Sequence, residues 1–303
     1  MKPAPYPGMP CATPHPSPGS REVALPQPQP SLLLLDLEGL PADWALVHGQ
    51  ALPFLRGLLE QGVWLGWASP GPTDGGLAWR GLYDGQPSPA GQGLLWRELS
   101  RAGVPVGIMN LPGVWPPPAV PGWLVARLDE AGQARHFTTP AELAGDLGEY
   151  QSGQLALAGR PAPRPHQRDE VFALWACLAR LVWQEAWRLM RASPPRLAGL
   201  GFQGLGQVYN MFAADPGRVS LLLAQMDEYA GRLAGWLKPR AILCLAGRAG
   251  LLVWAPGLIQ ASRLPEPRPW DLTPLVLGLL GLDIPPEMAG RPPAGLWPQE
   301  PHD

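Results

Sequence analysis

Apolar and polar residues occur along the chain in blocks whose lengths match strands and helices. Residues 31–41 read SLLLLDLEGLP, in which a leucine run ends at Asp36 and a glycine turn follows. An unbroken apolar run of this length is typical of a strand that is buried on both faces of a parallel sheet. Similar runs recur, and we expect strands at residues 31–37, 63–69, 104–110, 195–204 and 239–247.

Stretches with apolar residues at helical spacing separate these runs. In residues 169–193, for example, Phe172, Trp175 and Leu178 lie three residues apart, which predicts a long amphipathic helix. We expect helices at residues 52–62, 93–103, 169–193, 219–237 and 271–282. The alternation of strands and helices predicts an α/β fold, a doubly wound and mostly parallel sheet with helices on both faces.

The composition favours one α/β domain with long loops. Hydrophobic residues make up 46% of the 303 residues, which supplies a core, whereas charged residues make up 16% and there are 41 prolines and 37 glycines. Residues 1–30 are rich in proline and are expected to form a disordered tail. We expect residues 31–295 to form a single domain and residues 296–303 a C-terminal tail.

Charge, cysteine and hydrophobic patterns exclude several classes of protein. The net charge is −2 and no basic cluster occurs, so we expect no nucleic-acid partner. Three widely spaced cysteines, Cys11, Cys177 and Cys244, indicate free thiols, the last two buried, in a reducing compartment. No apolar segment has the length of a membrane span or a secretory signal, so a cytoplasmic location without a membrane span is expected. Core packing is the default role of the 14 tryptophans, but together with the low surface charge they also allow an apolar interface with a protein partner or in a homo-oligomer.

Four stretches carry a more specific pattern. Residues 32–64 combine the strand that ends in Asp36 with the helix LPFLRGLLEQG, and residues 69–96 contain an Ala-Trp pair among glycines and prolines. GVPVGIMNLPGVWPPPAVPGWLVARL (103–128) and PWDLTPLVLGLLGLDIPPEMAGRP (269–292) are the most specific. Together they resemble the type I phosphodiesterase and nucleotide pyrophosphatase family, within the alkaline phosphatase superfamily. The resemblance implies an alkaline-phosphatase-like α/β fold.

The resemblance also implies phosphate-ester hydrolysis by two divalent metal ions, usually zinc, with a threonine or serine nucleophile. Asp36 matches the first metal ligand of the family. The nucleophile position falls on Gly75, and the neighbouring Thr73 and Asp74 are the candidates to replace it. Asp36 has an alternative role, in which it only braces the turn that follows it.

The other metal ligands of the family are not found at the matching positions. The aspartate–histidine pair of one motif falls on Leu205 and Tyr209, and that of another falls on Gly247 and Arg248. Residues 167–301 contain no histidine, although the family takes its histidine ligands from this half. We therefore expect that a two-zinc site of the family type cannot be assembled here.

Two hypotheses follow. In the first, the chain is a catalytically inactive homologue without a cofactor that acts as a binding or scaffold protein. Arg248, Arg80 and Asp74 are then the candidate ligand-binding residues for a nucleotide or phosphate ester, with Arg248 in a salt bridge to Asp36. In the second, the chain is a hydrolase whose rebuilt site uses Asp36, Asp74 or Thr73 with one divalent ion, Zn²⁺, Mn²⁺ or Mg²⁺.

Two further aspartates have structural interpretations. Asp84 lies in a glycine turn and is expected to form that turn. Asp271 is expected to cap the N-terminus of the last helix, with Thr273 and Pro274 in its first turn. Neither residue is predicted to belong to a functional site.

Overall fold

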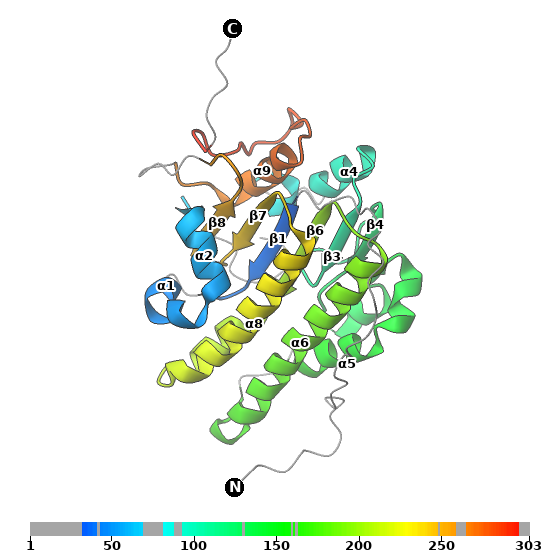
Figure 1. Cartoon of the computed structure of the whole chain (residues 1–303). Coiled ribbons are helices and arrows are strands. Elements are labelled where there is room, and N and C mark those ends of the chain that lie inside the picture. The colour runs from blue at the N-terminus through cyan, green and yellow to red at the C-terminus, as the bar shows by residue number, and fades with distance from the viewer. Residues whose placement is uncertain are drawn as a thin grey trace, which may run out of the picture.

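The protein is built around one eight-stranded sheet with the strand order β2-β8-β7-β1-β6-β3-β4-β5 (Figure 1). The computed structural model describes residues 32–40, 43–68, 81–87, 93–128, 131–158, 160, 163–247, 249–258 and 265–296. The strands are β1 (Leu32–Leu37), β2 (Val63–Gly66), β3 (Val106–Met109), β4 (Gly122–Val125), β5 (Thr138–Thr139), β6 (Leu197–Phe202), β7 (Ala241–Leu245) and β8 (Gly250–Trp254).

The middle of the sheet is parallel and its edges are antiparallel. β7, β1, β6, β3 and β4 run in the same direction. β8 pairs antiparallel with both β7 and β2, and β5 pairs antiparallel with β4. All six residues of β1 are buried, as its leucine run predicts for the central strand of an α/β sheet.

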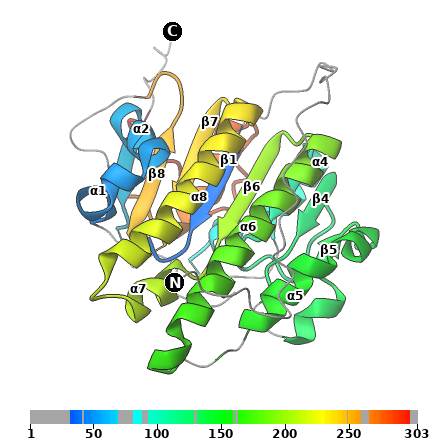
Figure 2. The ribbon, with the colours of Figure 1, turned by 60° about the horizontal axis from the view of Figure 1, so that its bottom comes forward.

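Helices cover both faces of the sheet. In the part of the chain that the structure describes, the α-helices are α1 (Trp44–Val47), α2 (Pro53–Gln61), α4 (Leu94–Arg101), α5 (Gly148–Leu157), α6 (Arg168–Ala192), α7 (Leu205–Met211), α8 (Pro216–Leu237) and α9 (Leu272–Leu279), and residues 81–84 are also helical. Short 3-10 helices lie at Gly49–Ala51, Ala131–Arg135, Ala141–Asp146, Pro165–Gln167 and Pro269–Asp271. Figure 1 shows α6 and α8 side by side in front of the strands, with α9 behind them. The second view shows α6 and α8 on the same face with α2 (Figure 2). The predicted α/β fold with helices on both faces is confirmed.

The five predicted strands and five predicted helices are all present within a few residues of their expected ends. The placement of β2 differs from a simple βαβ unit, because β8 and β7 lie between β2 and β1. The sequence interpretation also missed β4, β5 and β8 and the helices α1, α5 and α7. The two tails predicted at the chain ends fall outside the described residues, apart from Leu296.

Three smaller predictions have structural outcomes. Within the described residues, no helix has the length and apolar character needed to cross a membrane. Cys244 is a buried free thiol as predicted, but Cys177 is half-buried and disulfide-bonded, so the free-thiol prediction is wrong for it. Asp271 occupies the N-cap position of α9, but its carboxylate accepts hydrogen bonds from the backbone N–H groups of Arg268 and Arg291 instead of those of the helix.

Candidate functional site

Asp36 is the most unusual residue of the sheet, because it places a carboxylate among apolar strands. In the parallel register it lies beside Gly201 of β6 and Leu245 of β7, at the carboxyl ends of the three central strands. Its side chain is 1% exposed. The carboxyl edge of an open α/β sheet is the usual place for a ligand, so this is where a site is expected.

The two faces of β1 differ at this edge. Successive residues of a strand point to opposite faces. Phe202, in register with Leu37, approaches Tyr229 of α8 with 6.4 Å between ring centroids. Leu37 therefore points toward α8, and Asp36 points to the opposite face of the sheet.

The electrostatic surroundings of Asp36 disfavour its ionised form. Burial raises the pKa of its carboxyl well above the usual range, and the negative charge of Glu38 raises it further, while Arg127 acts in the opposite direction. Arg127 forms an ion pair with Glu38. Asp36 Oδ1 is buried and accepts no hydrogen bond. A buried acceptor without a donor is costly to stability, and such groups are concentrated at functional sites.

Three glycine turns lie close to one another at the carboxyl ends of the central strands. Gly39 follows β1 with φ +81°, Gly204 follows β6 with φ +87°, and Gly247 follows β7 with φ +50°. A Cβ atom on Gly39 would lie 2.4 Å from the backbone nitrogen of Gly206. A Cβ atom on Gly247 would lie 3.2 Å from the backbone nitrogen of Gly39. The backbones of the three turns are thus packed directly against one another, which only glycine permits at Gly39.

A buried polar network lies at the ends of the neighbouring strands. Asn110, directly after β3, has φ +64° and donates a hydrogen bond from Nδ2 to the Gly201 carbonyl oxygen at 2.8 Å. Its Oδ1 accepts hydrogen bonds from Tyr150 and Gln154 of α5. Gln203 Nε2 donates to Gln154, but Gln203 Oε1 is buried and has no partner. The network fixes the geometry of β3 and β6 at the edge that holds Asp36.

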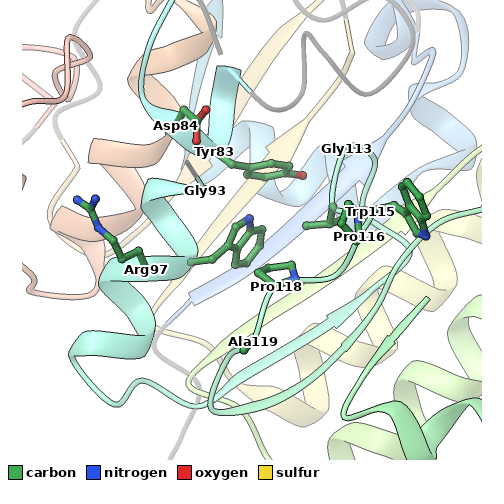
Figure 3. A pocket seen from close by; sticks show the side chains of 11 residues that line it. Tyr83, Asp84, Gly93, Arg97, Gly113, Trp115, Pro116, Pro118 and Ala119 are labelled. Carbon is green, nitrogen blue, oxygen red and sulfur yellow. The ribbon is translucent and has the colours of Figure 1, made fainter. Parts of the chain in front are cut away.

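Tyr83 lines a cavity of about 350 Å³ (Figure 3). The Tyr83 ring is 2% exposed, and burial and the charge of Asp36 raise the pKa of its hydroxyl well above the usual range. The hydroxyl donates a hydrogen bond to the Pro112 carbonyl oxygen at 3.0 Å. Asp84 also lines this cavity, and its Oδ1 accepts a hydrogen bond from the Leu94 N–H at the start of α4. Asp84 therefore holds the start of α4, and it stands directly before the turn at Gly85.

The structure tests only part of the predicted site. Thr73, Asp74, Arg80 and Arg248 lie outside the described residues, so their roles and the salt bridge from Arg248 to Asp36 stay predictions. Asp36 is placed at the sheet edge as expected.

Several residues at this edge were missed by the sequence interpretation. Glu38, Arg127, Tyr83 and Asn110 were not selected as candidates. Glu38 stands two residues after Asp36, and Asn110 stands in the most specific of the four motifs, so both had a signal in the sequence.

The residues present do not fit a two-metal centre of the phosphodiesterase type. Among the positions matched to metal ligands, Leu205 is buried and apolar, Tyr209 is 36% exposed, and Gly247 has no side chain. In the described ranges, no group of three or more His, Cys, Asp or Glu side chains could hold a metal ion. Among the carboxylates that the structure describes, Asp36 alone has a buried oxygen without a hydrogen-bond partner. Two zinc ions need several imidazole and carboxylate ligands, which these positions do not supply.

Comparisons with known proteins leave the family open. No family model and no curated protein matches the sequence. Among solved structures, phosphonoacetate hydrolase from Sinorhizobium meliloti 1021 in complex with phosphonoformate matches with TM-score 0.42 and 16% identity, over 71% of this chain and 55% of that chain. The same enzyme in complex with phosphonoacetate matches with TM-score 0.36 and 15% identity, over the same shares. The chain thus spans about half the length of the solved proteins it matches, and similarity at this level assigns neither a family nor an activity to it.

Proposed function

We propose that this chain is a catalytically inactive relative of the type I phosphodiesterases and nucleotide pyrophosphatases that acts as a binding or scaffold protein. The observation that carries the proposal is the packing of the turns after β1, β6 and β7. The family's two aspartate–histidine motifs match the start of α7, which follows the turn after β6, and the turn after β7; the matched positions there are Leu205, Tyr209 and Gly247. The contact between Gly39 and Gly206 leaves no room there for a larger side chain.

The motifs that shape the fold are kept, whereas the residues that would carry the chemistry are not. Residues 103–128 and 269–292 supply β3, the loop after it, β4 and α9, all of which pack into the core. A chain that only has to fold and bind retains such segments without retaining metal ligands. Asp36 remains because a binding site at the sheet edge still uses its carboxyl group.

The ligand we propose is an anion of the phosphate-ester or nucleotide class. Arg80, Arg248 and Asp74 are the binding residues that we propose for it, the arginines because guanidinium groups bind phosphate with two parallel hydrogen bonds. Calorimetric titration with AMP, phosphate and sulfate tests this choice. Arg248→Met should weaken AMP binding by about tenfold or more. Arg240→Met, at an exposed residue before β7, is the matched control and should leave binding unchanged.

A hydrolysis assay tests the absence of catalysis. Purified protein is incubated with bis(p-nitrophenyl) phosphate and added Zn²⁺, Mn²⁺ or Mg²⁺, in parallel with Asp36→Ala. The proposal expects the same background rate from both proteins with every metal. Metal-dependent turnover that disappears in Asp36→Ala would instead establish a working active site.

One observation favours a second candidate function, a hydrolase with a rebuilt site. The unpartnered Oδ1 of Asp36 is a group that a single divalent ion could use, together with oxygen atoms from Thr73 or Asp74. Metal analysis of the purified protein separates the two functions. A bound ion in most chains supports the hydrolase, and less than about a tenth of an ion per chain contradicts it.

A further inference from the structure

The cavity beside Tyr83 has the size of a small-molecule site and belongs to a different part of the molecule from the glycine turns. It lies between the helical residues 81–84, α4 and the loop after β3, and its volume of about 350 Å³ is at the lower end of the range for ligand sites, roughly 300–1,000 Å³. Figure 3 shows the Tyr83 ring on one side of the cavity and Pro118 on the other. None of the described residues that line this cavity has a role in the proposed phosphate site.

Aromatic and proline rings form part of the cavity wall, at five of its eleven described lining residues. Tyr83 and Trp96 pack together with 5.1 Å between ring centroids and an angle of 49° between the ring planes. Trp115, Pro116 and Pro118 complete the lining on the side of the loop. Flat aromatic and proline surfaces favour a planar ring, which gains edge-to-face and stacking contacts beyond the burial of its area.

Among the described lining residues, two are charged, Arg97 and Asp84, and both have hydrogen-bond partners. The Arg97 guanidinium donates hydrogen bonds to Glu287 at 2.7 Å and to Glu98 at 3.1 Å, so two carboxylates balance its charge. Asp84 is 1% exposed and accepts a hydrogen bond from the Leu94 N–H. A charged ligand would lose its hydration here without gaining a counter-charge, which is unfavourable.

We propose that this cavity is a binding site for an uncharged, planar aromatic molecule of one or two fused rings. The inference goes beyond the proposed phosphate site, because it assigns a second ligand, uncharged instead of anionic, to this cavity. Its observations are the size of the cavity, its aromatic and proline walls, and the pairing of both its charged groups.

The test uses indole as a neutral two-ring probe and ligand-observed NMR on the full chain. Indole should bind with a Kd of about 1 mM or tighter, the affinity that a ligand of this size reaches in an apolar pocket. The charged relatives indole-3-acetate and tryptamine should bind at least about tenfold more weakly. Absence of indole binding, or equal binding of either charged relative, overturns the proposal.

A pair of variants locates the site. Ala119 is exposed and lines one end of the cavity, so Ala119→Trp should fill the cavity without disturbing the fold and weaken indole binding by about tenfold or more. Ala213→Trp, exposed between α7 and α8, carries the same new ring away from the cavity and should leave the Kd unchanged. Circular dichroism verifies that both variants are folded. Unchanged binding in Ala119→Trp, or equal losses in the two variants, would place indole elsewhere and overturn the assignment.

Discussion

Two buried carboxylates in different regions of the molecule differ in the hydrogen bonds that they accept. Asp227 of α8 is 2% exposed and accepts hydrogen bonds from the backbone N–H groups of Phe54, at 3.0 Å, and Leu55, at 2.8 Å, at the start of α2. Asp36 is 1% exposed, and its Oδ1 accepts none. Burial raises the pKa of both groups, but for Asp227 the two N–H donors oppose that shift.

The difference is the one expected between a structural carboxylate, Asp227, and the functional carboxylate that we propose for Asp36. Asp227 caps a helix that is 172 residues away in sequence and fastens α2 to α8. Asp36 keeps a polar group in an apolar region without the hydrogen bonds that would offset its desolvation, and this arrangement lowers stability. Groups that lower stability persist where a ligand uses them. The four predictions below test this contrast, starting with the packing of the edge on which Asp36 lies.

The largest effect is expected from Gly39→Ala at the carboxyl edge. The new Cβ atom would lie 2.4 Å from the nitrogen and 2.6 Å from the Cα of Gly206, and φ at this residue is +81°. We expect the free energy of unfolding, measured in urea, to fall by about 3–5 kcal/mol.

Gly57→Ala in α2 is the control for that experiment. A Cβ atom there meets nothing within 4 Å, so the substitution should stabilise the helix by roughly 0.5–1 kcal/mol. If Gly39→Ala were tolerated equally well, the glycine turns after β1, β6 and β7 would not be packed against one another in solution.

The second effect tests the partnered carboxylate. Asp227→Ala removes both acceptors of the α2 N–H groups and should lower the free energy of unfolding by about 2–3 kcal/mol. Asp227→Asn keeps one acceptor oxygen and should lose about half as much. Glu228→Ala, at a neighbouring residue whose side chain is 58% exposed, should change stability by less than about 0.5 kcal/mol. Equal losses in Asp227→Ala and Glu228→Ala would contradict the assigned role.

The third effect has the opposite sign. Asp36→Asn removes a buried charge that lacks a full set of partners, so we expect it to raise the free energy of unfolding at pH 8 by about 1–2 kcal/mol. Because the pKa of Asp36 is raised in the folded protein, the stability of the wild type falls as the pH rises from about 4 toward that folded pKa. The asparagine does not titrate, so its advantage should shrink toward pH 4. A variant less stable than the wild type at pH 8 would show that Asp36 is structural, as Asp227 is.

Elements with a local sequence pattern could be predicted, whereas elements that depend on long-range pairing could not. β1 and α6 were predicted because their patterns are local, a run of leucines and a helical repeat of apolar residues. β5 has two residues and β4 follows a proline-rich loop, so neither has a pattern of its own. β2 was predicted as a strand, but its position next to β8 depends on the pairing of residues almost 190 positions apart.

The residues around the site differ in the same respect, because only some of them have a local signal in the sequence. Asp36 was found because it interrupts an apolar run. Arg127, which opposes its pKa shift, follows β4 and reaches the same edge only when β6 and β3 lie between β4 and β1. The Asp227 cap was missed for the same reason, since a carboxylate within a helix resembles an ordinary surface residue until α2 packs against it.

The smallest effect is expected from His48, because one of its ring nitrogens has a hydrogen-bond partner and the other has none. Its Nδ1 lies 2.8 Å from Ser220 Oγ, whereas its buried Nε2 has no hydrogen-bond partner. Burial lowers the pKa of the imidazole, and the charge of Asp43 opposes that shift. Stability is therefore present above the unfolded pKa of about 6.5 and is lost as the pH falls through the folded pKa.

His48→Asn removes that titration and keeps a polar group near Ser220. The stability of the wild type relative to the variant should thus decline between pH 7.5 and pH 5 by less than about 1 kcal/mol, measured as the difference between two urea unfolding curves at each pH. Parallel pH profiles for the two proteins would mean that the imidazole is solvated in both states. A decline would place His48 between Asp227 and Asp36, because the hydrogen bond to Ser220 offsets only part of the cost of burying the ring.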